Sequence, residues 1–171
     1  MTRKPPNILT LEQIAASGTE HAHQAALFAW CKHPFHEGRL MPELDLLYAI
    51  PNGGARTSKF GQLAAGARMR AEGVKAGVPD LCLPVARRGW HSIYIEMKRG
   101  RNTLEGMQKQ WLAGLFLAGN CCGVAYSWQE GAELLSWYLG RTNKRPVGII
   151  KAAQKALEHN PELKPLLQGF V

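Results

Sequence analysis

The sequence lacks the features of a membrane or secreted protein. No apolar run approaches the roughly 20 residues that a membrane-spanning helix needs. The first residues, MTRKPPNILTLEQ, do not contain the apolar core of a signal peptide, so we expect a cytoplasmic protein. The four cysteines have no spacing typical of a disulfide framework. Reduced thiols in the protein core are therefore the simpler interpretation.

Acidic residues are also scarce. The chain of 171 residues has 21 Lys and Arg but only 13 Asp and Glu, which gives a net charge of +8. Residues 54–101 contain ten basic residues and three acids, so nearly all of the excess positive charge lies in this segment. Such a balance favours a polyanionic partner, most often a nucleic acid, because binding to phosphates releases counterions.

Hydrophobic periodicity and turn residues predict one compact α/β domain. Helices are expected at 19–32, 57–72, 103–118, 129–139 and 147–171, the last one broken at its prolines. Strands are expected at 44–50, 79–85, 90–97 and 121–127. This order indicates a mixed central β-sheet flanked by helices. We expect a leader at 1–18, the main domain at 19–140 and a C-terminal helical extension at 141–171.

Two of the predicted strands contain acids within otherwise apolar runs. Asp80 lies in the first of these strands and Glu96 in the second. A three-residue hairpin loop, Arg87-Arg88-Gly89, would pair Ala86 with Trp90. Counting back from that pair places Asp80 directly opposite Glu96, on the same face of the sheet, with Cβ atoms about 5 Å apart.

Lys98 lies two residues beyond Glu96 and therefore on the same face. Two carboxylates this close repel each other unless a cation lies between them, and Mg²⁺ or Mn²⁺ meets that need. A lysine beside the cation can orient the attacking water and offset the charge of the transition state. The alternative is a solvated cluster of ion pairs. Three charges at matched positions in a basic segment favour the metal site.

The motifs around these residues resemble those of the VRR-NUC family in the PD-(D/E)XK nuclease superfamily. Four motifs match the family in order and spacing: PNGGAR from Pro51, GVPDL from Gly77, YIEMK from Tyr94 and QKQWL from Gln108. The resemblance covers most of the chain, from about Thr19 to Leu139. It implies a restriction-endonuclease-like core and metal-dependent hydrolysis of phosphodiester bonds in DNA. Stand-alone members, mostly viral and bacterial, resemble homodimers that cut branched DNA such as Holliday junctions.

The resemblance also implies roles for individual residues. Asp80 and Glu96 match metal ligands, Glu20 matches a third acid of the site, and Lys98 matches the residue that handles the water. Gln108 matches the family's glutamine on the helix after the second strand. Residues 104–107 depart from the family pattern, so Gln110 remains a competing candidate. A DNA endonuclease is the first hypothesis. A non-catalytic DNA-binding module and a flap, nicking or restriction-type nuclease are the alternatives.

Nine residues are candidates for binding the DNA backbone, through glycine amides or positive charge. They are Asn52, Gly53, Gly54, Arg56, Lys59, Arg87, Arg88, Arg99 and Arg101. For the two arginines at the hairpin tip, a solvated turn is the alternative. Glu20 could instead belong to a capping box with Ser17. Cys31 and the nearby histidines lack the cysteine pair of a structural zinc site, which argues against zinc.

Overall fold

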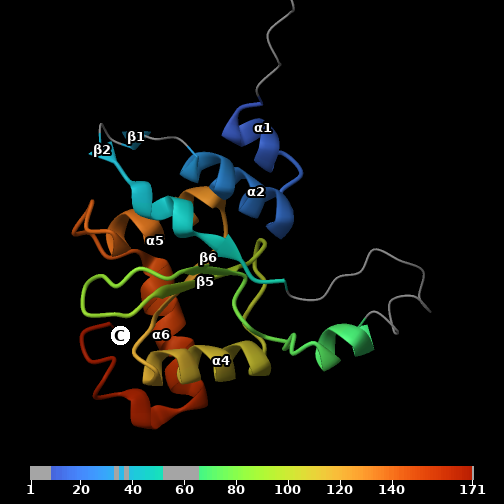
Figure 1. Cartoon of the computed structure of the whole chain (residues 1–171). Coiled ribbons are helices and arrows are strands. Elements are labelled where there is room, and N and C mark those ends of the chain that lie inside the picture. Colours follow the sequence, from blue (N-terminus) through green and yellow to red (C-terminus); the bar gives the residue numbers. More distant parts are fainter. Residues whose placement is uncertain (1–8, 33–34, 37–38, 52–65, 171) are drawn as a thin grey trace, which may run out of the picture.

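The structure is a computed structural model of the chain, and it describes residues 9–32, 35–36, 39–51 and 66–170 (Figure 1). Its centre is a four-stranded sheet in the order β3-β4-β5-β6. The strands are β3 Tyr48–Ala49, β4 Leu81–Leu83, β5 Ile93–Met97 and β6 Cys121–Ala125. β4 runs antiparallel to both β3 and β5, and β6 runs parallel to β5. The sheet is therefore mixed, and the predicted α/β fold is confirmed.

Helices cover both faces of this sheet. They are α1 Leu11–Ala15, α2 Glu20–Cys31, α4 Gly106–Leu117, α5 Trp128–Tyr138 and α6 Val147–His159. Two 3₁₀ helices, η1 Pro42–Leu46 and η2 Pro161–Leu163, and a small ribbon of β1 Phe35–His36 and β2 Arg39–Leu40 complete the described elements. Residues 66–71 are also helical. Figure 1 shows α2 on one side of the sheet and α4 on the other.

The alternation of β5 and β6 explains these two layers. Ile93, Ile95 and Met97 pack with α2 and α5 in one hydrophobic cluster. Cys122 and Val124 pack with α4 and α6 in the other cluster. Because successive side chains of a strand point to opposite faces, a residue between Ile95 and Met97 must point toward the α4 layer. Glu96 is that residue.

The predicted strand at 44–50 is wrong over its first half. Residues Pro42–Leu46 form the 3₁₀ helix η1, and only Tyr48–Ala49 pair with β4. The proline suits the first turn of a helix because the missing N–H has no partner there. Leu44 and Leu47, three residues apart, are both buried, which is the spacing of a 3₁₀ turn.

The β4–β5 hairpin has the predicted register. Leu81 pairs with Ile95 and Leu83 with Ile93. Continuing this ladder by one residue places residue 80 opposite Glu96, as the sequence predicts. The two acids therefore lie side by side at one end of the hairpin.

The predicted three-residue turn, however, is wrong. Arg87 pairs with Trp90, so the loop has two residues, Arg88 at φ 53° and Gly89 at φ 82°. Two positive φ angles are typical of a type I′ turn, whose twist suits a hairpin. The segment between Leu83 and Arg87 has one residue more than its partner, and it contains Pro84, which cannot donate to the ladder. This extra residue compensates for the shorter turn, and the register at Asp80 is unchanged.

The described part of the C-terminal segment belongs to the same core. In α6, Ala152, Ala153 and Ala156 are fully buried, and Leu163 is 1% exposed. A Cβ at Gly148 would collide with the carbonyl oxygen of Val124, so α6 begins in direct contact with β6. The boundary at residue 140 stays a prediction, but residues beyond it contribute to the packing of the sheet.

Candidate active site

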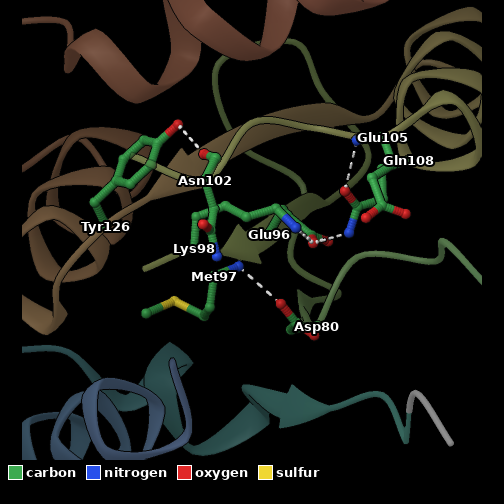
Figure 2. Close-up of polar contacts among 8 residues, drawn as sticks. All are labelled: Asp80, Glu96, Met97, Lys98, Asn102, Glu105, Gln108 and Tyr126. Atoms are coloured by element: carbon green, nitrogen blue, oxygen red, sulfur yellow. Dashed lines mark hydrogen bonds and ion pairs between the residues drawn. The ribbon is translucent and has the colours of Figure 1, made fainter. Parts of the chain in front are cut away.

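Asp80 lies at the start of β4 and is held by the backbone on both sides. Its carbonyl oxygen accepts a hydrogen bond of 2.7 Å from the N–H of Ile50 in the β3 segment. Its carboxylate oxygen Oδ2 accepts one of 2.8 Å from the N–H of Met97 (Figure 2). The half-buried carboxylate therefore lies across the end of β5, beside Glu96.

Glu96 is a buried acid with one oxygen paired and the other not. It is 3% exposed, and Lys98 is 8% exposed. The Oε1 atom of Glu96 accepts a hydrogen bond from Gln108 Nε2 and lies 3.1 Å from the ammonium nitrogen of Lys98. Its Oε2 is buried and has no hydrogen bond to any described residue. Such an atom is costly unless another group satisfies it.

Burial raises the pKa of Glu96 to about 8, and the negative charge of Asp80 adds to this effect. Lys98 lowers the pKa, and Glu20 raises it by a smaller amount. Burial therefore opposes the ionisation of Glu96, while the charge of Lys98 favours it. The contribution of Glu20 also means that the first residue of α2 lies within electrostatic reach of the pair.

The start of α2 excludes one alternative for Glu20. Thr19 is the N-cap, and its hydroxyl accepts a hydrogen bond of 3.1 Å from the N–H of Ala22. The hydroxyl of Ser17 lies 3.1 Å from that of Thr19. Glu20 is thus the first helical residue, whereas a capping box needs its acid at the third helical position. The capping box with Ser17 is wrong.

The glutamine of the site is Gln108, which lies in the first turn of α4. Its side-chain oxygen accepts a hydrogen bond of 3.0 Å from the N–H of Glu105, and its nitrogen donates to Glu96 (Figure 2). Gln110 is exposed. The helix begins at Gly106 with Glu105 as its cap, three residues later than the sequence predicts. The two hydrogen bonds fix the orientation of the Gln108 amide.

Gly77, the first residue of the GVPDL motif, was not among the predicted site residues, but the structure brings it next to the start of α4. It has φ 82°, and a Cβ there would lie 2.8 Å from the Cβ and 2.9 Å from the carbonyl carbon of Met107. The indole N–H of Trp111 donates a 3.1 Å hydrogen bond to Ala76, in the same loop. The loop before Asp80 therefore packs directly on the first turn of α4. The glycine in the GVPDL motif was the signal that could have found it.

The donor atoms fit a hard divalent cation. Among the residues that the structure describes, no three His, Cys, Asp or Glu side chains are grouped so as to hold a metal ion. Two carboxylates with water and substrate phosphate are nevertheless a common donor set for Mg²⁺. The buried, unsatisfied Oε2 of Glu96 is an oxygen that such an ion would satisfy. Cys31, by contrast, is buried in the hydrophobic core and its pKa is raised to about 12, so it is a protonated core thiol.

The structure describes only some of the predicted DNA-binding residues. Asn52, Gly53, Gly54, Arg56 and Lys59 lie outside the described residues. The hairpin arginines have partners within the chain. Arg87 forms an ion pair of 2.8 Å with Glu43. Arg88 donates to the carbonyl oxygens of Trp137 at 2.6 Å and Thr142 at 2.8 Å.

Arg99 and Arg101 are exposed and lie one and three residues after Lys98. Among the DNA-binding candidates that the structure describes, these two are the closest in sequence to Glu96.

Comparison with known proteins gives one informative result. The chain matches no family model and no curated protein. Among solved structures, a VRR_NUC domain protein matches with a TM-score of 0.56 and 27% sequence identity, over 71% of this chain and 88% of that one. The chain is therefore similar in fold and in sequence to this VRR_NUC domain protein, which supports the resemblance predicted from its motifs. The VRR-NUC fold is a nuclease-type fold, so the coarse class predicted from the sequence is confirmed.

None of the described helices is both long and apolar enough to span a membrane.

Proposed function

We propose that this protein is a metal-dependent endonuclease that hydrolyses phosphodiester bonds in DNA. The observation that carries the proposal is the buried pair of Glu96 and Lys98 next to the carboxylate of Asp80, with one Glu96 oxygen unsatisfied. A charged cluster that served only the fold would have its buried oxygens paired. This cluster instead leaves an acceptor for a ligand.

Asp80 and Glu96 would hold Mg²⁺ or Mn²⁺, with Glu20 as a third acid at the edge of the site. When bound, such an ion lowers the pKa of water and neutralises charge on the phosphate. The raised pKa of Glu96 supports this assignment, because a cation would replace the proton on a carboxyl that is costly to ionise alone.

Lys98 and Gln108 both contact the Oε1 oxygen of Glu96, and we assign them different roles. The ammonium of Lys98 is 3.1 Å from Glu96 Oε1 and is almost fully buried, so its position is fixed before substrate binds. It can donate a hydrogen bond to the attacking water or to a phosphate oxygen. Gln108 is a positioning residue, since it holds the Glu96 carboxylate from the side of α4.

Branched DNA, such as a Holliday junction, is the substrate that we propose, with a homodimer as the acting form. The support is the family resemblance together with the net charge of +8. Contacts to phosphates depend on the shape of DNA rather than on base sequence. A two-fold dimer would present two equivalent sites to the two strands of a symmetric junction.

A cleavage panel tests this proposal. Labelled four-way junction, flap, nicked duplex and linear duplex are incubated with Mg²⁺ or Mn²⁺, next to an Asp80→Asn control. We expect cleavage of branched DNA that needs the metal and disappears in the control. Products on a linear duplex at one sequence would support a restriction-type nuclease instead. Absence of products on every substrate would contradict the nuclease and leave the DNA-binding module.

A further inference from the structure

Tyr126, beside the candidate active site, contacts a basic loop and a lysine of α6, and its own N–H donates a hydrogen bond of 2.9 Å to the carboxylate of Glu130. Tyr126 directly follows Ala125 at the end of β6. The carbonyl oxygen of Ala125 accepts a hydrogen bond of 2.8 Å from the N–H of Lys98. Tyr126 and Arg99 are therefore the next residues outward from this paired end of β5 and β6. Whatever they bind lies close to Glu96 and Lys98.

Tyr126 holds the loop that carries two exposed arginines. Its hydroxyl donates a hydrogen bond of 3.2 Å to the carbonyl oxygen of Asn102 (Figure 2). The N–H of Asn102 in turn donates a 3.0 Å hydrogen bond to the carbonyl oxygen of Arg99, which closes a turn. Arg99 and Arg101 are both exposed. Their loop is thus tied to the end of β6.

The third cation comes from α6, beyond the segment that resembles the family. The ammonium of Lys151 lies 4.5 Å from the centre of the Tyr126 ring, which is a cation–π contact. Lys151 is exposed, and its neighbour Ala152 is completely buried. The position of the lysine is therefore set by the packing of α6 rather than by a mobile segment.

The basic character continues along α6 toward α4. Lys155, one turn after Lys151, forms an ion pair of 2.5 Å with Glu158. Lys109 of α4 lies 2.7 Å from the same Glu158. One acid is thus shared by two lysines, and this part of the surface keeps an excess of positive charge.

We propose that Arg99, Arg101 and Lys151 form one phosphate-binding surface, here called the Tyr126 surface, that holds a duplex arm of the DNA next to the cleaved bond. The inference rests on the proposed function and adds α6 to the DNA interface. Two of these cations are exposed on the loop that is hydrogen-bonded to Tyr126, and the third lies over its ring, so together they are suited to a run of backbone phosphates beside the proposed cleavage site. Tyr126 is a positioning residue, since it contacts both the loop and Lys151.

The test measures the salt dependence of DNA binding, with cleavage prevented by the Asp80→Asn substitution in every protein. Fluorescence anisotropy with a labelled four-way junction and a linear duplex is recorded between about 50 and 200 mM salt. Lys151→Gln and Arg101→Gln are compared with Lys164→Gln, which removes the same charge from an exposed position beyond the end of α6. Circular dichroism confirms that each variant folds.

We expect the slope of log affinity against log salt to fall by about 0.9 for Lys151→Gln and about 0.9 for Arg101→Gln. The double variant should lose about twice as much, and Lys164→Gln should keep the original slope. An unchanged slope in Lys151→Gln, or an equal loss in Lys164→Gln, would overturn the Tyr126 surface. These outcomes are independent of the cleavage panel, so failure of the surface and failure of the nuclease are distinguishable.

Discussion

Glu96 brings together most of the chemistry at the scale of single residues. Its carboxylate contacts Lys98 from the same strand and Gln108 from the neighbouring helix, and it lies beside Asp80. Burial makes its ionisation costly, and the Lys98 ammonium offsets only part of the rise in its pKa. The ionisation of such an acid changes strongly when any of its neighbours is replaced.

The two glutamines of α4 provide a matched comparison. Gln108→Ala removes the hydrogen bond to Glu96, whereas Gln110→Ala removes an exposed side chain two residues away. Residues that orient metal-binding groups typically contribute 10- to 100-fold to metal affinity or activity. We expect Gln108→Ala to lose about that factor in cleavage and in metal affinity measured by calorimetry, and Gln110→Ala to lose little. Equal effects of the two substitutions would contradict the positioning role of Gln108.

At the scale of the elements, the positions of the side chains in the site depend on contacts between the ends of neighbouring segments. Arg88 shows this for the hairpin turn. Its guanidinium lies 4.8 Å from the centre of the Trp137 ring and donates to the carbonyl of Trp137, in the last turn of α5. Carbonyls at the end of a helix have no partner within the helix, and a basic side chain satisfies them. The arginine therefore joins the hairpin to α5.

Gly77 shows the same dependence for the loop before Asp80, and it yields a prediction. Gly77→Ala places a Cβ against the backbone of Met107 at a positive φ angle, so the first turn of α4 must move away from the loop. We expect a loss of about 1–3 kcal/mol in the free energy of unfolding, together with reduced cleavage.

Gly73→Ala is the control for this prediction, because Gly73 also has a positive φ, 92°, but a Cβ there would meet nothing within 4 Å. It should share the backbone strain and keep the cleavage activity per folded molecule. Urea denaturation and the cleavage assay measure the two effects. If both variants cleave equally well, the close approach of α4 does not position Gln108.

At the scale of the whole molecule, the C-terminal segment completes the core. Trp90 of the hairpin lies edge-to-face with Phe116 of α4 at 5.8 Å and with Phe170 at 5.7 Å between ring centroids. Arg145 lies over the Phe170 ring at 4.5 Å. These contacts join the chain end to the hairpin and to α4. Residues after 140 therefore help to hold the layer that carries Gln108.

Gly148 is the position at which this packing can be tested. Gly148→Ala would drive a Cβ into the carbonyl oxygen of Val124, and we expect a loss of about 1–3 kcal/mol in the free energy of unfolding. Gly114→Ala is the matched control, since it lies within α4 with nothing within 4 Å of the added Cβ. It should stabilise the protein by up to about 1 kcal/mol. Urea melts measure both, and equal stabilities would contradict the tight α6–β6 contact.

The sequence by itself determined the features that depend on local periodicity. Alternation along a strand puts Glu96 and Lys98 on one face, and the hairpin count places Asp80 opposite Glu96 even though the turn was assigned incorrectly. The count succeeded because the extra residue near Pro84 offset the shorter turn. Helix α2 followed from an equally local pattern.

Only the tertiary structure decided which distant residues meet. Gln108 rather than Gln110 contacts Glu96 because Gly77 allows the start of α4 to approach the loop. Arg88 contacts α5, and Lys151 lies over Tyr126, because layers far apart in sequence pack together. Such contacts depend on the docking of separate elements, and a pattern of neighbouring residues along one chain segment does not contain that information.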